Sequence, residues 1–177
     1  MPLWVSLETS APRYMVTVLL ILNTLLVVLF QMPAARRSTN PRRAGSLVLL
    51  AALVLGMGNI LMWAARVGGV TTSVILLVSA VVAWTIGEVA SQAGTWSLSF
   101  ELTPSATAGA YQGFFTMGWH TGLMLGPVVV TSLAVEHGLV GWLVLSFVLA
   151  AAGGLLCLLG RRTPIEGPTL PLATIAG

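Results

Sequence analysis

Five runs of apolar residues, each long enough to cross a lipid bilayer, occupy most of the 177-residue sequence. The hydrocarbon core of a bilayer is about 30 Å thick and needs about 20 apolar residues per helix. The runs cover roughly residues 14–32, 45–65, 73–99, 108–135 and 140–160. Only 7% of the residues are charged, against about 25% in soluble domains. The sequence therefore predicts an all-α membrane protein with a five-helix transmembrane bundle over 14–162.

The connections between these runs are short where glycine and a few polar residues interrupt them. "RVGGVTTS" separates the second run from the third, and "EHGLVG" separates the fourth from the fifth. Such turns predict antiparallel neighbouring helices. The segment 163–177 contains three prolines and no helical or strand period. We expect it to be a disordered cytoplasmic tail.

Arginine placement predicts the orientation of the bundle. The formal charge of +3 comes from eight arginines and five glutamates, and most of the arginines flank apolar runs, so they indicate topology rather than nucleic-acid binding. Six of the eight fall on one side of a five-span bundle, namely Arg36, Arg37, Arg42, Arg43, Arg161 and Arg162. The positive-inside rule then places the C-terminus in the cytoplasm and the N-terminus outside a plasma membrane. A cleaved signal peptide is disfavoured, because its positive charges would precede the first run.

Glu88, in "WTIGEVASQAG", lies in the middle of the third run, where a carboxylate is costly unless it has a function or a partner. At 100° per residue, other polar residues project within about 60° of it. This polar stripe consists of Thr85, Ser91, Gln92, Thr95 and Ser99. It indicates either a substrate and proton pathway or a seam of hydrogen bonds between helices.

Two more polar residues lie near the middle of predicted spans, Asn23 in the first and His120 in the fourth. They predict that spans one, three and four face the interior, whereas spans two and five, with Asn59 nearer one end and Ser146, are peripheral. His120 could pair with Glu88 or relay a proton. It could equally be a packing residue whose hydrogen bonds are satisfied.

Small residues recur in the fourth run at a spacing of four. Gly118, Gly122 and Gly126, followed by Pro127, would let another helix approach closely and would bend their own helix. We interpret them as helix-packing and gating residues.

Motifs of enzymes and metal sites are absent from the sequence. It contains no Gly-x-Ser-x-Gly, His-Glu-x-x-His, paired aspartates or cysteine cluster. The single Cys157 is interpreted as an inert packing thiol. We therefore expect no enzyme activity, no cofactor, no metal and no nucleic-acid partner.

The stretch "SFELTPSATAGAYQGFFTMGWHTGLMLGP" resembles the loop and helix around the eleventh transmembrane segment of major facilitator superfamily transporters, in their drug-efflux-like branch. "ILNTLLVVLFQMPAARR" is similar to the eighth segment of those proteins and its cytoplasmic loop. The resemblance covers nearly all of residues 1–162. It implies that the five spans correspond to segments eight to twelve and that residues 1–13 are an external loop.

The resemblance implies a C-terminal portion of a transporter that moves small molecules across the membrane, with proton-coupled efflux as the expected activity. Its substrate would bind at the midplane between two halves. Glu88 would be a protonatable cavity residue, with Gln92 and Asn23 as polar contacts and His120 as a proton partner. A missing N-terminal half, or a partner subunit, would supply the opposite wall. The alternative is a non-transporting membrane assembly subunit that packs through its glycine-rich fourth helix.

Overall fold

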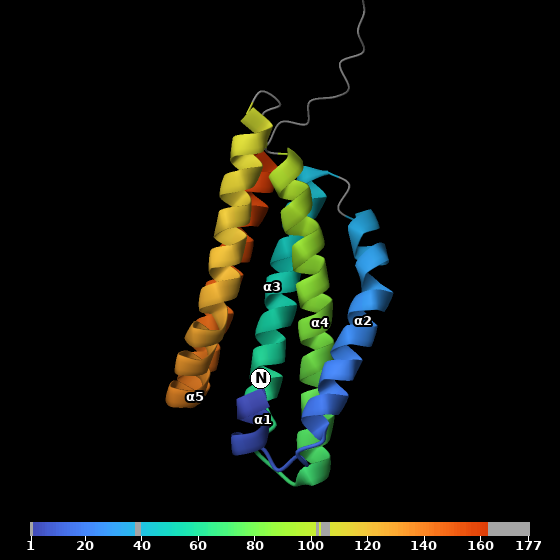
Figure 1. Cartoon of the computed structure of the whole chain (residues 1–177), viewed down its shortest axis with the longest axis vertical. Helices are drawn as coiled ribbons and strands as arrows, with labels where there is room; N and C mark the ends of the chain where they lie inside the picture. Colours follow the sequence, from blue (N-terminus) through green and yellow to red (C-terminus); the bar gives the residue numbers. More distant parts are fainter. Residues whose placement is uncertain (1, 38–39, 102, 104–106, 163–177) are drawn as a thin grey trace, which may run out of the picture.

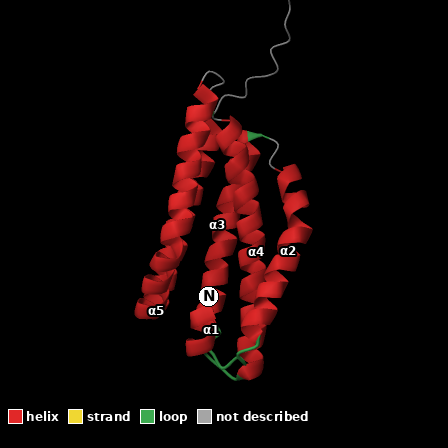
Figure 2. Ribbon diagram, in the orientation of Figure 1, coloured by secondary structure: helices red, strands yellow, loops and turns green. Residues whose placement is uncertain are grey.

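The computed structural model describes residues 2–37, 40–101, 103 and 107–162, and all the regular elements within these ranges are helices. They are α1 (Pro2–Glu8), α2 (Met15–Arg37), α3 (Pro41–Ala64), α4 (Val70–Glu101) and α5 (Ala108–Arg162). The long helices lie side by side, and the short α1 lies at one end of the bundle (Figures 1 and 2). The predicted all-α class is therefore confirmed for the described residues. The segment 163–177 lies outside them.

Helix α5 is a hairpin of two helical arms rather than one straight helix. Gly138 is the residue of α5 with non-helical backbone angles (φ 52°, ψ −128°), which suit glycine because L side chains rarely adopt positive φ. The first arm runs from Ala108 away from the end where α4 stops, and the second arm returns to that end at Arg162 (Figure 1). This reversal is the turn that "EHGLVG" predicts.

Four helical segments in the described ranges are long and apolar enough to cross a membrane: Met15–Ala34, Pro41–Ala64, Val70–Glu101 and Glu136–Arg162. The first arm of α5 is helical but is not among them, so the predicted count of five spans is not confirmed. This arm contains Gln112, His120 and several glycines, which lower its hydropathy. The chain is therefore an all-helical protein with four candidate membrane-spanning helices.

Helix α3 is the centre of the bundle, and the prediction that the second span is peripheral is wrong. Its most apolar stretch is 39% buried, compared with 33% in α4, 17% in the second arm of α5 and 11% in α2. Small residues explain this position, because they let neighbouring backbones approach. The small buried residues of α3 are Ala44, Gly45, Ala51, Ala52, Gly56 and Gly58.

Glycines on the neighbouring helices complete these close contacts with α3. A Cβ placed on Gly94 of α4 would lie 2.6 Å from the Val48 side chain, and one on Gly153 of α5 would lie 2.8 Å from Ala52. Both distances are below ordinary van der Waals contact. The contacts of α3 with α4 and with α5, which we call the helix seams, therefore tolerate no larger side chain at these two positions without a shift of the helices.

The N-terminus of α3 is fixed by local sequence. Asn40 precedes the helix with extended backbone angles, and its Oδ1 accepts a hydrogen bond from the Arg43 backbone N–H at 2.8 Å. Pro41 occupies the first helical position, where its missing N–H costs nothing. "NPRR" is thus a helix-start sequence as well as an arginine cluster.

The arginines of both predicted clusters lie at the same end of the bundle. Arg36 is in the last turn of α2, Arg42 and Arg43 are in the first turn of α3, and Arg161 and Arg162 end α5. These helix ends are close together at one end of Figure 1. The opposite end holds α1, the α3–α4 connection and the Gly138 turn. We refer to the two ends as the arginine end and the α1 end.

Candidate functional site

Glu88 lies in the middle of α4 and is exposed, not enclosed by the helix bundle. Its Oε1 accepts a hydrogen bond from Nε2 of Gln92, one helical turn later, at 3.3 Å. Residues four apart on a helix are neighbours, so the helix itself sets this pair. The distance is at the long end of the usual range, so the bond is weak. The carboxylate therefore keeps acceptor capacity for another partner.

Glu88 and Gln92 line a cavity of about 520 Å³ that is bounded by α3, α4 and both arms of α5. We call it the central cavity. Its other lining residues include Leu55 and Asn59 from α3, Trp84 and Ser91 from α4, and Trp119, Trp142 and Leu145 from α5. The lining is mainly apolar and aromatic, with a few polar groups, as expected for a site that binds a small organic molecule.

The same two residues also line a second hollow, of about 420 Å³, between α2 and α4. We call it the α2–α4 groove. On α4 its lining extends from Glu88 to Phe100, and on α2 it includes Val27 and Gln31. Twelve residues of helix correspond to about 18 Å. The groove therefore extends from Glu88 towards the arginine end of the bundle.

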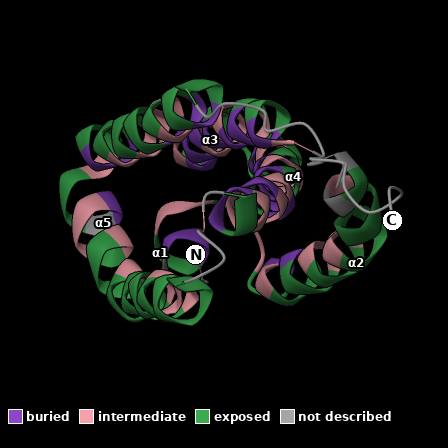
Figure 3. Cartoon of the chain, turned by 90° about the horizontal axis from the view of Figure 1, so that it is seen from above, coloured by how far each residue is buried: buried purple, intermediate pink, exposed green. Residues whose placement is uncertain are grey.

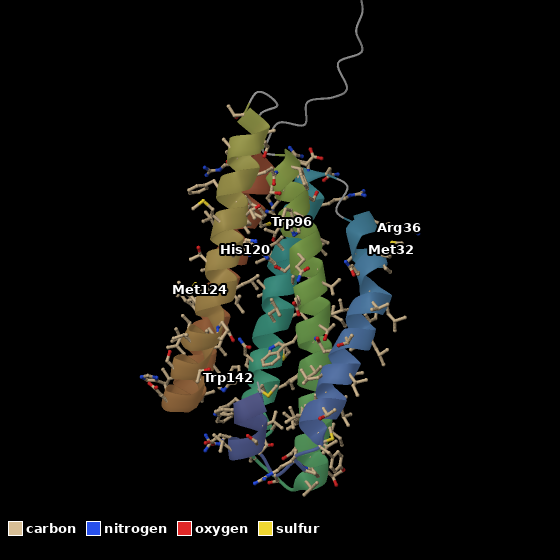
Figure 4. The ribbon with its side chains drawn as sticks, viewed as in Figure 1. Met32, Arg36, Trp96, His120, Met124 and Trp142 are labelled. Atoms are coloured by element: carbon tan, nitrogen blue, oxygen red, sulfur yellow. The ribbon has the colours of Figure 1, made fainter. Side chains whose placement is uncertain are left out.

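The two hollows extend in different directions from Glu88. Trp142 of the central cavity lies beside α1, whereas Trp96 of the α2–α4 groove lies towards the arginine end (Figure 4). Glu88 and Gln92 line both hollows. The carboxylate is thus at the point where two separate hollows adjoin.

A buried polar network forms one wall of the central cavity. Asn59, only 5% exposed, donates from Nδ2 to the Ser146 hydroxyl at 3.1 Å and accepts from Trp84 Nε1 at 3.0 Å. This network joins α3, α4 and α5. Sequence reasoning missed it by assigning Asn59 and Ser146 to peripheral spans. Trp84 lies one turn before Glu88 on the same helix. This spacing is the one signal in the sequence that could have indicated that the Trp84 indole lies beside the cavity.

The polar stripe of α4 is partly a hydrogen-bond seam. Thr85 is fully buried, and its hydroxyl accepts a bond from Asn23 Nδ2 of α2 at 2.8 Å. Thr95 donates to the Ser91 carbonyl at 2.7 Å within its own helix. Asn23 thus contacts α4 at Thr85, and Asn23 is not among the lining residues of either hollow at Glu88. Glu88, Ser91 and Gln92 are the stripe residues that line the central cavity.

His120 is exposed on the first arm of α5 and lines a different hollow, of about 550 Å³, together with Gln112, Thr116 and Thr121. The described residues form one ion pair, between Arg66 and Glu8. Glu88 and His120 therefore do not form the pair that the sequence suggested. The reason is the rotation of the first arm of α5 about its own axis. Its Phe115 and Trp119 contact Trp96 of α4, which leaves His120 on another face.

Gly118, Gly122 and Gly126 face open space within the described part of the chain. A Cβ added at any of the three would meet nothing within 4 Å beyond its chain neighbours and the adjacent backbone of its own helix. Pro127 is exposed within the same arm, and the helix keeps helical backbone angles there. Within the described part of the chain, these glycines are therefore not at a close contact with another helix, and their packing role stays a prediction.

The arrangement at Glu88 presents a single carboxylate among mainly apolar lining residues, so it offers hydrogen-bond acceptors to a small molecule or faces a positively charged group. Among the described residues there is no group of three or more histidine, cysteine, aspartate or glutamate side chains that could hold a metal ion. Comparisons with protein-family models, curated proteins and solved structures found no match for this chain.

Proposed function

We propose that this chain acts in the transport of small molecules across a membrane, with Glu88 as the proton-carrying residue. The observation that carries the proposal is that Glu88 lines both the central cavity and the α2–α4 groove. A carboxylate that lines two hollows can exchange protons through one of them and contact a substrate in the other. An ionisable residue at membrane depth commonly marks such a pathway.

The transporter class that we propose is the major facilitator superfamily, with this chain corresponding to segments eight to twelve. Its sequence resemblance supports this, and so does the alternating direction of α2, α3, α4 and the two arms of α5, which is compatible with five crossings. The arginine end would face the cytoplasm. Proton-coupled efflux of small amphipathic molecules is the activity that we propose, together with a second half or partner subunit.

Efflux of ethidium from cells that produce the protein tests this function. We expect faster efflux than in control cells, and we expect a protonophore and Glu88→Gln each to abolish the difference. Glu101→Gln is the matched control, because Glu101 is an exposed carboxylate at the end of the same helix. Proton-coupled efflux that survives Glu88→Gln would eliminate the proton-carrier role.

A second candidate function is a non-transporting assembly subunit. The unfilled space beside Gly118, Gly122 and Gly126 favours it, because glycines on the other seams are in close contact. If wild-type protein gives no efflux but forms a stable complex that Gly122→Leu disrupts, the assembly function is the better description.

A further inference from the structure

The first turn of α3 and the last turn of α5 are in direct backbone contact at the arginine end. A Cβ placed on Gly160 of α5 would lie 2.5 Å from the Pro41 carbonyl oxygen. One placed on Gly45 of α3 would lie 3.1 Å from the Cα atom of Cys157. Both glycines are buried. These two helix ends therefore lie side by side, although they are far apart in the sequence.

This contact brings two pairs of arginines together. Arg42 and Arg43 are in the first turn of α3, and Arg161 and Arg162 are the last two residues of α5. All four side chains are exposed. The described residues form one ion pair, at the α1 end, so Glu101 at the end of α4 pairs with none of the four. Within the described part of the chain, the four positive charges have no carboxylate partner.

Helix α4 closes one side of the contact between α3 and α5. Ala44 and Val48 of α3 form a buried apolar cluster with Leu98 of α4, and Leu156 of α5 packs against this cluster. The other side of the contact faces outward. Seen from above, α3 is buried on its inner edge and exposed on its outward edge (Figure 3).

Arg42 and Arg161 both point to the outward side. Each follows by one residue the buried residue at the contact, Pro41 or Gly160, and is therefore turned about 100° from it. The residues that pack against α4 are turned in the opposite direction on both helices. The two guanidinium groups thus flank the outward side of the contact from the two helices.

An apolar surface continues below these two arginines. Leu49 and Leu53 are turned within about 20° of Arg42 on α3, and Leu53 is 55% exposed. Gly154 is turned within about 20° of Arg161 on α5, and a Cβ placed there would meet nothing within 4 Å. From Arg42 to Leu53 the helix rises about 16 Å. The outward side therefore combines positive charge at the membrane end with an apolar strip below it.

We propose that Arg42 and Arg161 bind the phosphate of an anionic phospholipid, whose acyl chain lies along Leu49 and Leu53 beside the contact of α3 and α5. Guanidinium groups bind phosphate oxygens in a bidentate manner, and basic residues beside membrane helices bind anionic headgroups. The positive-inside rule requires arginines at one end, but it does not require two of them to flank one apolar strip. The inference goes beyond the proposed function, because it applies equally to a transporter and to an assembly subunit.

Native mass spectrometry of the purified protein in a mild detergent tests the proposal. The dissociation constant of the first bound lipid is measured for phosphatidylglycerol and for phosphatidylcholine with the same acyl chains. Each arginine near an anionic headgroup should strengthen binding about fivefold. We therefore expect the double change Arg42→Gln and Arg161→Gln to weaken phosphatidylglycerol binding about 25-fold. Unchanged binding in this variant would overturn the proposal.

The matched control is the double change Arg43→Gln and Arg162→Gln. It removes the same charge from the same two helix ends, but these side chains are turned about 200° from the contact. Binding should stay within about twofold of wild type, since only a diffuse attraction is lost. Equal weakening by the two double variants would mean that the lipid responds to net charge alone, and the assigned site would be wrong.

Glycerol phosphate, which carries the anion without the acyl chains, separates a lipid site from a site for soluble anions. It should not displace phosphatidylglycerol, and displacement at equal concentration would overturn the assignment to lipid. Wild-type protein gives a second measurement in case a double variant does not fold. Phosphatidylglycerol with a photoreactive acyl chain should label α3 and the second arm of α5, and labelling confined to α2 would refute the proposal. None of these results depends on ethidium efflux.

Discussion

Removing the Asn59 side chain should destabilise the bundle more than removing any other single polar group of the central cavity wall. Asn59 joins three helices through Trp84 Nε1 and the Ser146 hydroxyl, and it is 5% exposed. Asn59→Ala deletes both bonds. Ser146 retains the Trp142 carbonyl as an acceptor at 2.8 Å, but the indole N–H of Trp84 loses its partner.

The magnitude follows from these two bonds. Interhelical hydrogen bonds in membranes contribute on average about 0.6 kcal/mol each. A buried donor left without an acceptor costs about 1–3 kcal/mol more. We therefore expect Asn59→Ala to lower the free energy of unfolding by about 2 kcal/mol or more. Thr24→Ala, at an exposed hydroxyl on α2, should change it by less than about 0.5 kcal/mol.

The assay is equilibrium unfolding in mixed micelles, followed by far-ultraviolet circular dichroism. Trp84→Phe alone leaves the Asn59 carbonyl oxygen without its donor, whereas the double variant removes both partners. The double variant should be less destabilised than the sum of the single changes by about 1 kcal/mol. Additive effects, within about 0.5 kcal/mol, would refute the conclusion that this pair is energetically coupled.

Two further predictions concern the helix seams. Gly94→Leu should prevent close packing of α4 on α3 and reduce stability by about 1–3 kcal/mol. Gly122→Leu, at a position where an added Cβ meets nothing within 4 Å beyond its own stretch of helix, should leave the unfolding of the single chain unchanged. Equal effects of the two changes in the same unfolding assay would contradict this packing of α4 on α3. Thr85→Val keeps the side-chain shape but removes the acceptor of Asn23, and should lower stability by about 0.6–1.7 kcal/mol. An unchanged unfolding curve would mean that α2 is held by apolar contacts alone.

The positions of the helices could be predicted from the sequence, because bilayer-length apolar runs leave few alternatives. The third run, predicted at 73–99, lies within α4 (Val70–Glu101), and the turn at Gly138 lies within "EHGLVG". Glu88 stands out by its polarity in apolar surroundings, and it does line the two hollows. Strong local patterns of this kind depend little on the rest of the fold.

The arrangement of the helices could not be predicted in the same way. Counting mid-depth polar residues places the second span outside, but its glycines and alanines, which permit the closest approach, decide its central position. The burial of α1 depends on a carbonyl of α3 that is 58 residues away in sequence, so no local pattern indicates it. The rotation that separates His120 from Glu88 likewise comes from the contacts of Trp96 with the first arm of α5.

The partner of Asn59 in α5 has a consequence for biosynthesis. Ser146 follows Asn59 by 87 residues. At a synthesis rate of about 5–20 residues per second, Asn59 reaches the membrane roughly 4 to 17 seconds before Ser146 does. During that interval α3, the helix on which the others assemble, carries an amide with an incomplete set of partners. The nascent chain therefore depends on the insertion machinery, or on water at its lateral exit, to shield α3 until the α5 hairpin arrives.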